Sequence, residues 1–182
     1  MINELKFLFK DKNLAESVQE FIEMMGEELD DFDVDDFDLD ELEELDCSNA
    51  KITNLKGIEK LTSLKSIRLS NNNISDLTPL AELTELKYLD LSYNKIKDIS
   101  PLSGLTNLKK LTFIDNLIND ISPLKNMTKL ETLDLQNNRV TDISPLEGCT
   151  NMDRFEFNYN QIRDLSPLAG MKKLSTLEIK EN

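Results

Sequence analysis

Hydrophobic residues recur along this chain with a fixed period of 22 residues and without insertions. Within each unit, apolar residues occupy positions 1, 3, 8, 11, 14, 17 and 20. Position 1 falls at Leu45, Ile67, Leu89, Leu111, Leu133, Phe155 and Leu177. A repeat of this length predicts a solenoid, because each unit can bury its apolar face only against its neighbours.

Each unit is expected to contain one short strand, a turn and a return segment. The triplet Leu89-Asp90-Leu91 alternates inward and outward like a half-buried strand, and stacked copies predict a parallel sheet. Position 6 is asparagine in every unit except the first. The amide of this asparagine can form hydrogen bonds with backbone groups of the turn that follows the strand. Ser100-Pro101 and its equivalents predict a 3₁₀ or α turn, with serine as the N-cap and proline at the first helical position. An aspartate precedes each turn by two residues, at Asp76, Asp98, Asp120, Asp142 and Asp164. Asx-type bonding explains every copy, so these aspartates predict corners and not a metal site.

These motifs resemble the leucine-rich repeats of bacterial internalins, whose consensus is close to LxxLxLxxNxIxDIxPLxxLTN. The resemblance covers residues 45–182. It implies an α/β leucine-rich repeat solenoid with parallel strands on the concave face and short 3₁₀ or α turns on the convex face. It also implies that a protein partner is bound on the concave face. The first copy departs from the pattern at Ala50, Asn54 and Gly57, as expected of a terminal repeat with a capping role.

Residues 1–44 are predicted to form a small, acidic N-terminal cap, and residues 45–182 six 22-residue repeats plus a partial seventh. A capping box begins at Asn13, and Gly26 is a plausible stop for the helix that follows. Leu14, Val18, Phe21, Ile22 and Met25 share one face of this helix. We expect that face to cover the first repeat, and a helix that binds a partner is the alternative.

The net charge of −14 arises entirely from the cap, which contains 17 acidic residues and only 3 lysines. In the acidic run at residues 27–46, acidic residues alternate with apolar ones, which suits an extended strand or a loop. Its aspartates do not form a calcium loop, because the glycine and the closing glutamate of such a loop are replaced by Asp36 and Leu42. The run is interpreted either as a solvated edge of the cap or as a docking strip for a basic protein.

Several classes of chemistry are disfavoured by composition. The chain has no histidine, which excludes Ser-His-Asp and Cys-His catalytic pairs and histidine-containing zinc sites. Cys47 and Cys149 take apolar positions four repeats apart, roughly 19 Å at the usual strand spacing, so no disulfide should join them. No catalytic residue, cofactor or metal is therefore predicted. A nucleic-acid partner is not expected without a net basic surface, nor a membrane partner without a long apolar run.

The outward positions of repeats three to six carry an unusual set of residues. All three tyrosines of the chain fall there, together with apolar and charged residues. Interface centres are enriched in aromatics and arginine, so these positions are the predicted partner-binding site. The set comprises Tyr88, Asp90, Tyr93, Lys110, Thr112, Ile114, Leu117, Asp134, Arg154, Glu156 and Tyr159.

The sequence thus predicts a non-catalytic protein-interaction module, expected to be a monomer, with the acidic segment steering a basic partner. One alternative is a cytosolic immunity or inhibitor protein that neutralises a toxin or enzyme. Another is a fragment of an exported adhesin. The sequence shows no signal peptide, C-terminal cap or wall anchor of the kind usual among internalins, which favours the cytoplasm. A trimmed piece of a longer chain would favour a secreted or cell-surface location instead. The identity of the partner is open.

Overall fold

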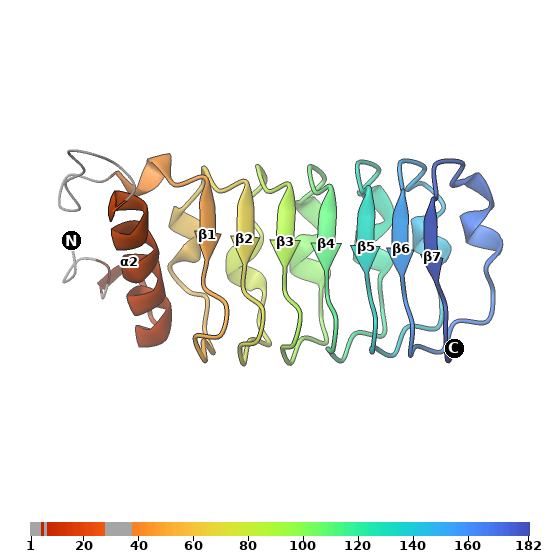
Figure 1. The fold of residues 1–182 in the computed structure, drawn as a ribbon, viewed down its shortest axis with the longest axis horizontal. Helices are drawn as coiled ribbons and strands as arrows, with labels where there is room; N and C mark the ends of the chain where they lie inside the picture. Colours follow the sequence, from red (N-terminus) through yellow and green to blue (C-terminus); the bar gives the residue numbers. More distant parts are fainter. Residues whose placement is uncertain (1–4, 6, 28–37) are drawn as a thin grey trace.

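The computed structural model describes residues 5, 7–27 and 38–182, which form an elongated solenoid with an α-helix at its N-terminal end (Figure 1). One sheet runs the length of the molecule, and its seven parallel strands lie in chain order. The strands are β1 (Glu44–Asp46), β2 (Ser66–Arg68), β3 (Tyr88–Asp90), β4 (Lys110–Thr112), β5 (Thr132–Asp134), β6 (Arg154–Glu156) and β7 (Thr176–Glu178). The 3₁₀ turns are η2 (Leu39–Glu41), η3 (Ile58–Lys60), η4 (Thr78–Leu80), η5 (Ser100–Gly104), η6 (Ser122–Asn126), η7 (Ser144–Leu146) and η8 (Ser166–Gly170). The predicted α/β leucine-rich repeat solenoid is confirmed.

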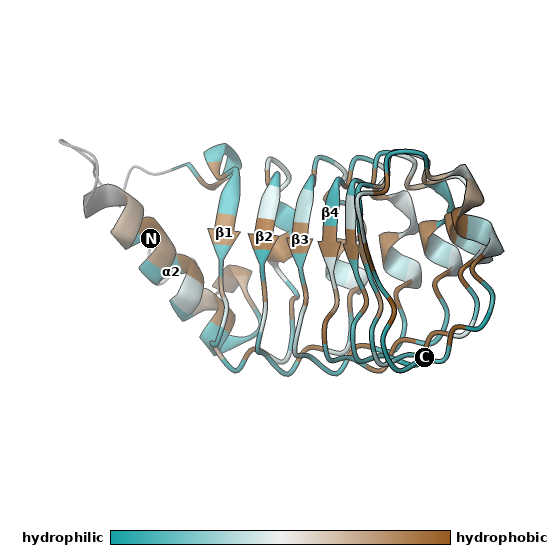
Figure 2. Cartoon of the chain, turned by 45° about the vertical axis from the view of Figure 1, so that its right-hand side comes forward, coloured by the Kyte–Doolittle hydropathy of each residue, from teal (hydrophilic) through white to brown (hydrophobic). Residues whose placement is uncertain are grey.

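Equivalent residues of successive repeats lie side by side. Strand pairing joins residues 22 apart throughout, for example Leu89 with Leu111 and Leu111 with Leu133. The middle residue of each strand from β1 to β6 is buried. In Figure 2 a hydrophobic band crosses the labelled strands β1 to β4. The other apolar positions fill the interior behind the sheet and make one continuous core. The first and third residues of each strand therefore point away from the core.

The asparagine at position 6 ties each repeat to the one before it, as predicted. In the fourth repeat, the Asn116 side chain donates to the carbonyls of Leu91 at 3.0 Å and Phe113 at 3.2 Å. Its Oδ1 accepts from the backbone N–H of Ile96 at 3.0 Å. Equivalent bonds are made by Asn72, Asn94, Asn138, Asn160 and Asn182. This ladder satisfies turn groups that are shielded from water.

Each corner aspartate accepts a hydrogen bond from the backbone two residues further on, as the Asx interpretation predicts. Asp98 Oδ1 accepts from Ser100 N at 2.8 Å, and all four other copies do the same. This bond and the serine hydroxyl hold the pKa of Asp98 below its ordinary value. The prediction that serine caps the turn was wrong in detail, because Ser100 is the first residue of the turn and Ile99 precedes it as the cap.

The N-terminal helix α2 (Lys12–Glu27) packs beside β1 and buries Leu14, Val18 and Ile22 completely. This position confirms the predicted cap and leaves the apolar face of the helix occupied, so the partner-binding alternative is not supported. Both predicted ends were wrong. Asp11 caps the helix instead of Asn13, since its Oδ1 accepts from Asn13 N at 2.9 Å, and the helix continues through Gly26.

The cap also explains why the first repeat departs from the pattern. Gly57 has a φ of +113°, and a Cβ built on it would lie 2.4 Å from the carbonyl oxygen of Leu8. Proline cannot adopt that conformation or fit that space. Asp11 Oδ2 meanwhile accepts from Thr53 N at 2.8 Å and Asn54 N at 3.0 Å. Asn54 still makes the corner bond, since its Oδ1 accepts from Lys56 N at 2.8 Å. The contact with the cap is therefore added to the corner of the first repeat.

Much of the acidic run, including the aspartates tested as a calcium loop, lies outside the described residues. Within the described part, Asp38 caps η2, so residues Leu39–Glu41 form a 3₁₀ turn and not the extended strand that was one of the two expected forms. Leu42 is buried and joins the core of the first repeat. Among the described residues no helix is long and apolar enough to cross a membrane.

Candidate protein-binding surface

The outer face of the sheet forms a groove of about 820 Å³ that extends from β1 to β6. Three parallel rows of side chains line it, because each strand contributes its first residue, its last residue and the residue two positions further on. The central row is formed by the last residues, which are Asp46, Arg68, Asp90, Thr112, Asp134, Glu156 and Glu178. Since strand pairing is in register from β1 to β7, the rows are regular and the groups on them are fixed relative to one another.

Eight of the eleven predicted site residues line this groove, and the fold brings them together. They are Tyr88, Asp90, Lys110, Thr112, Ile114, Asp134, Arg154 and Glu156. Tyr88 is 46% exposed and lies directly beside Lys110 on the neighbouring strand. Together with Ile114, these residues provide an aromatic, a cationic and an apolar group on one surface. The prediction rested on tyrosine, apolar residues and arginine, and Arg154 lines the same groove.

The other three predicted residues lie outside the groove. Tyr93 and Tyr159 occupy position 5, which follows the strand, and Leu117 occupies position 7, on the flank of the solenoid. Position 5 adopts the left-handed conformation in every repeat, with φ of 56° at Tyr93 and 58° at Tyr159. This backbone turns both tyrosine side chains away from the groove.

Sequence reasoning also omitted residues that line the groove. Among them are Arg68 and Gln136, which occupy the same rows as the predicted residues. Both could have been found, since the row positions follow from the repeat numbering alone. Their polar character concealed them, because the prediction gave weight to exposed aromatic and apolar residues.

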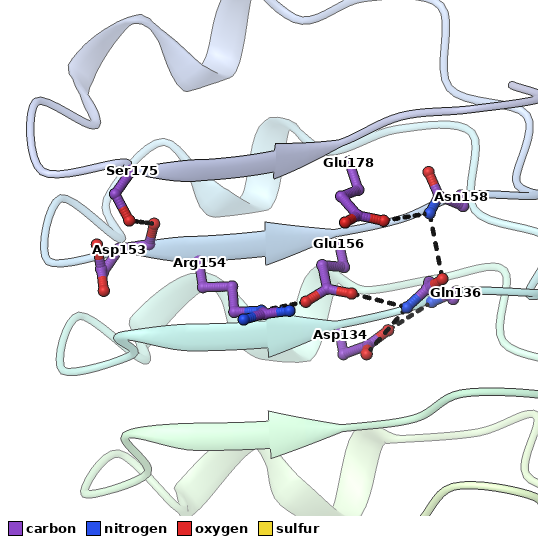
Figure 3. Close-up of polar contacts among 8 residues, drawn as sticks. All are labelled: Asp134, Gln136, Asp153, Arg154, Glu156, Asn158, Ser175 and Glu178. Atoms are coloured by element: carbon purple, nitrogen blue, oxygen red, sulfur yellow. Dashed lines mark hydrogen bonds and ion pairs between the residues drawn. The ribbon is translucent and has the colours of Figure 1, made fainter.

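A polar network organises the C-terminal half of the groove (Figure 3). The Gln136 amide donates to Asp134 Oδ2 at 3.2 Å and to Glu156 Oε2 at 2.8 Å, so one side chain bridges two carboxylates. Arg154 forms an ion pair with Glu156. Asn158 continues the network, donating to Gln136 Oε1 at 3.2 Å and to Glu178 at 2.8 Å.

Asp134 and Glu156 are each only 8% exposed and lie on adjacent strands. Burial raises the pKa of Asp134, and the nearby charge of Glu156 raises it further, although hydrogen bonds from Gln136 and the charge of Arg154 oppose the shift. The groove therefore holds carboxylates that repel one another in a partly dehydrated setting.

Neither cysteine of the chain is an activated nucleophile. Burial raises the pKa of Cys47 to about 12 and that of Cys149 to about 11, so both thiols stay protonated and unreactive at neutral pH. Within residues 5, 7–27 and 38–182, no three acidic or cysteine side chains are grouped to hold a metal ion. The fixed, polar and partly aromatic surface is suited to contact with another molecule.

Comparison with known proteins agrees with this architecture. A family model of leucine-rich repeats, described as two copies, matches residues 40–82, 84–126 and 128–170. The chain therefore belongs to the leucine-rich repeat family, whose members generally serve in protein interactions. Comparison with curated protein sequences gives no match.

Solved structures define the type of repeat more closely. The internalin InlF of Listeria monocytogenes is 31% identical, with a TM-score of 0.76 over 96% of this chain and 57% of its own. The internalin InlC2 of the same species is 30% identical, with a TM-score of 0.58 over 97% of this chain and 96% of its own. A leucine-rich repeat protein of Leptospira interrogans is 27% identical, with a TM-score of 0.63 over 70% of this chain and 34% of its own. The chain is an internalin-type leucine-rich repeat protein, and it spans 57% of the length of InlF.

Proposed function

We propose that this chain is a non-catalytic module that binds a protein partner in the concave groove. The observation that carries the proposal is the convergence of Tyr88, Lys110 and Ile114 on one rigid surface from two neighbouring strands and the turn that follows. An exposed tyrosine and an arginine such as Arg154 are the residue types that dominate binding energy at protein interfaces. Because the backbone is fixed by its hydrogen-bond ladder, little entropy is lost when a partner docks.

The acidic segment before the groove would accelerate the approach of a basic partner. Asp38, Asp40, Glu41, Glu43 and Glu44 are exposed and lead directly into β1. Charges at the rim of an interface act mainly on the association rate, and salt screens them. An association rate that does not change between low and high salt would contradict this steering role.

The docking surface can be tested with two matched triple variants in affinity capture from lysate and culture medium of the source organism. The groove variant carries Tyr88→Ser, Ile114→Ser and Arg154→Ser. The flank variant carries the equivalent changes at Tyr159, Leu117 and Arg139, all of which are exposed outside the groove.

We expect the groove variant to lose the captured partner and the flank variant to retain it, with unchanged circular dichroism for both. Retention by the groove variant, together with loss by the flank variant, would move the binding surface to the flank. Retention by both would refute binding through either surface.

A further inference from the structure

The charges in the groove are ordered in a way that the proposed function does not require. The central row carries five carboxylates and one guanidinium along the sheet, and three of the carboxylates, Asp90, Asp134 and Glu156, line the groove itself. The cations of the first and third rows, Lys110, Arg154 and Lys180, are exposed at the edges of the face. The middle of the face is therefore mainly anionic, and it lies between exposed cationic side chains.

Among the described residues, cations pair with only two of the five carboxylates of this row. Arg68 lies 3.8 Å from Asp46, and Arg154 is paired with Glu156. Asp90 Oδ1 accepts from Ser92 N at 3.0 Å and Thr112 Oγ1 at 2.8 Å, both neutral donors. Among the described residues, the carboxylate of Asp134 accepts hydrogen bonds only from Gln136. Burial and the neighbouring Glu156 raise the pKa of Asp134, so a cation placed above it would relieve unfavourable charge.

The carboxylates also have a regular spacing. Asp46, Asp90, Asp134 and Glu178 occupy every second strand, which places neighbours about 9.6 Å apart at the usual strand separation. A polyproline II segment advances about 9.3 Å over three residues. A cation at every third residue of such a segment would therefore meet a carboxylate each time, provided that the segment lies along the groove and across the strands.

We propose that the central row binds a basic, extended segment of a protein partner, with its lysine or arginine side chains over Asp90 and Asp134. The inference rests on the proposed function, since it assigns the chemistry of the partner that occupies the same groove. Tyr88 and Ile114 would pack against the segment between its cations, and Lys110 would contact an acidic or polar group beside it.

The test uses a synthetic probe, because a positively charged extended peptide reproduces the essential chemistry. The probe is a blocked peptide of four Lys-Pro-Pro units, and the control peptide has the same composition with its lysines contiguous. Binding is followed by amide chemical shifts of the isotopically labelled full chain. We expect saturable shifts at residues 90–92 and 134–136, and weaker binding of the control peptide.

Two matched double variants separate the groove from the acidic segment. Asp90→Asn with Asp134→Asn retains the Oδ1 acceptor of each side chain, while Asp38→Asn with Asp40→Asn removes the same charge outside the groove. Each lost contact is a partly exposed ion pair, so we expect the groove variant to bind the probe about tenfold more weakly and the outer variant less than about twofold.

The inference is overturned if the probe does not bind, if its shifts map to residues 38–43, or if the two double variants lose affinity equally. Those results would leave the proposed function to be judged by the groove and flank variants in the capture experiment. Loss of capture by the groove variant with no binding of the lysine probe would mean that the groove holds a partner of different chemistry.

Discussion

Replacement of Asn116 by alanine is the sharpest test of how the solenoid is held together. The side chain is 6% exposed and lies between the third and fourth strands. It donates to the carbonyls of Leu91 and Phe113 and accepts from the N–H of Ile96, all at 3.0–3.2 Å. Alanine removes these bonds in one step and leaves little room for water to replace them.

The cost depends on which backbone groups keep another partner. The carbonyl of Leu91 still accepts from Asn94 at 3.1 Å, and that of Phe113 still accepts from Asn138 at 2.8 Å. The N–H of Ile96 has no second acceptor among the described residues and is left unsatisfied, at a cost of about 1–3 kcal/mol. Adding two weakened carbonyl interactions gives an expected loss of about 2–4 kcal/mol in the free energy of unfolding.

Equilibrium unfolding in urea, followed by far-ultraviolet circular dichroism, measures this loss directly. The control is Asn182→Ala. Asn182 makes the equivalent bonds in the last repeat, and its Oδ1 accepts from Ile162 N at 3.2 Å, but the residue is exposed. We expect the control to lose less than about 1 kcal/mol, since water can reach the released groups. A loss below about 1 kcal/mol for Asn116→Ala, or equal losses for both, would refute the view that burial gives the ladder its strength.

Three further predictions concern backbone and charge. Gly57→Ala should lower the free energy of unfolding in urea by about 2–4 kcal/mol, because φ is positive at Gly57 and an added Cβ would collide with the cap. Gly104→Ala is the control: a Cβ there would meet no atom within 4 Å, so the change should be neutral or stabilising. Tyr93→Asn and Tyr159→Asn should each raise the free energy of unfolding by about 0.5–1 kcal/mol, because asparagine tolerates the left-handed conformation better; a decrease would indicate that the rings stabilise the fold. Burial alone would raise the pKa of Asp11, but hydrogen bonds from the Thr53 loop outweigh it and hold the pKa below its ordinary value. The carboxylate therefore stabilises the fold above the unfolded-state pKa of about 3.9, and this stabilisation is lost as the pH falls through the folded-state pKa. The free energy of unfolding, measured from pH 6 to 2, should therefore depend less on pH in Asp11→Asn than in the unmodified chain. An unchanged slope would contradict this role of Asp11.

The repeat architecture was predictable because its determinants are local and recur in register. Leu89, Leu91 and Ile96 occupy core positions in their repeat, and all three are buried as expected. The asparagine ladder and the aspartate corners could also be read from residue type and position, since each uses a side chain whose hydrogen-bonding groups match the nearby backbone. Repetition made each inference stronger, because one geometry had to serve every copy.

The cap was harder to predict because it depends on contacts between segments far apart in the sequence. Asn13 is a residue type that often caps a helix, yet Asp11 is the cap in this structure. Asp11 is held in place because its Oδ2 also accepts hydrogen bonds from Thr53 N and Asn54 N. Gly26 favours a helix end, but tertiary packing of α2 against β1 outweighs that local preference.

The candidate site was predicted in composition but not in shape. Outward positions are readable from the period of two, which correctly placed Tyr88, Asp90 and Ile114 in one groove. The same rule failed beyond the strand, where left-handed residues at position 5 redirect Tyr93 and Tyr159. Nothing in either tyrosine signals this conformation, whereas Asn49, Asn71, Asp115 and Asn137 at the equivalent position do.

This contrast suggests how to separate structural from functional positions in such a repeat. At positions 6 and 10 the backbone requires asparagine and aspartate, so their repetition reflects folding alone. At position 5 the backbone favours asparagine, so a tyrosine there is retained against a local cost. On the central row, Asp90 and Asp134 also accept a hydrogen bond from the backbone N–H two residues further on. Thr112 and Glu156 occupy the same row without that bond. The fold therefore does not require an aspartate at this position. The fold therefore tolerates a neutral residue on the row, and the proposed basic segment would account for carboxylates beyond those that bond the backbone.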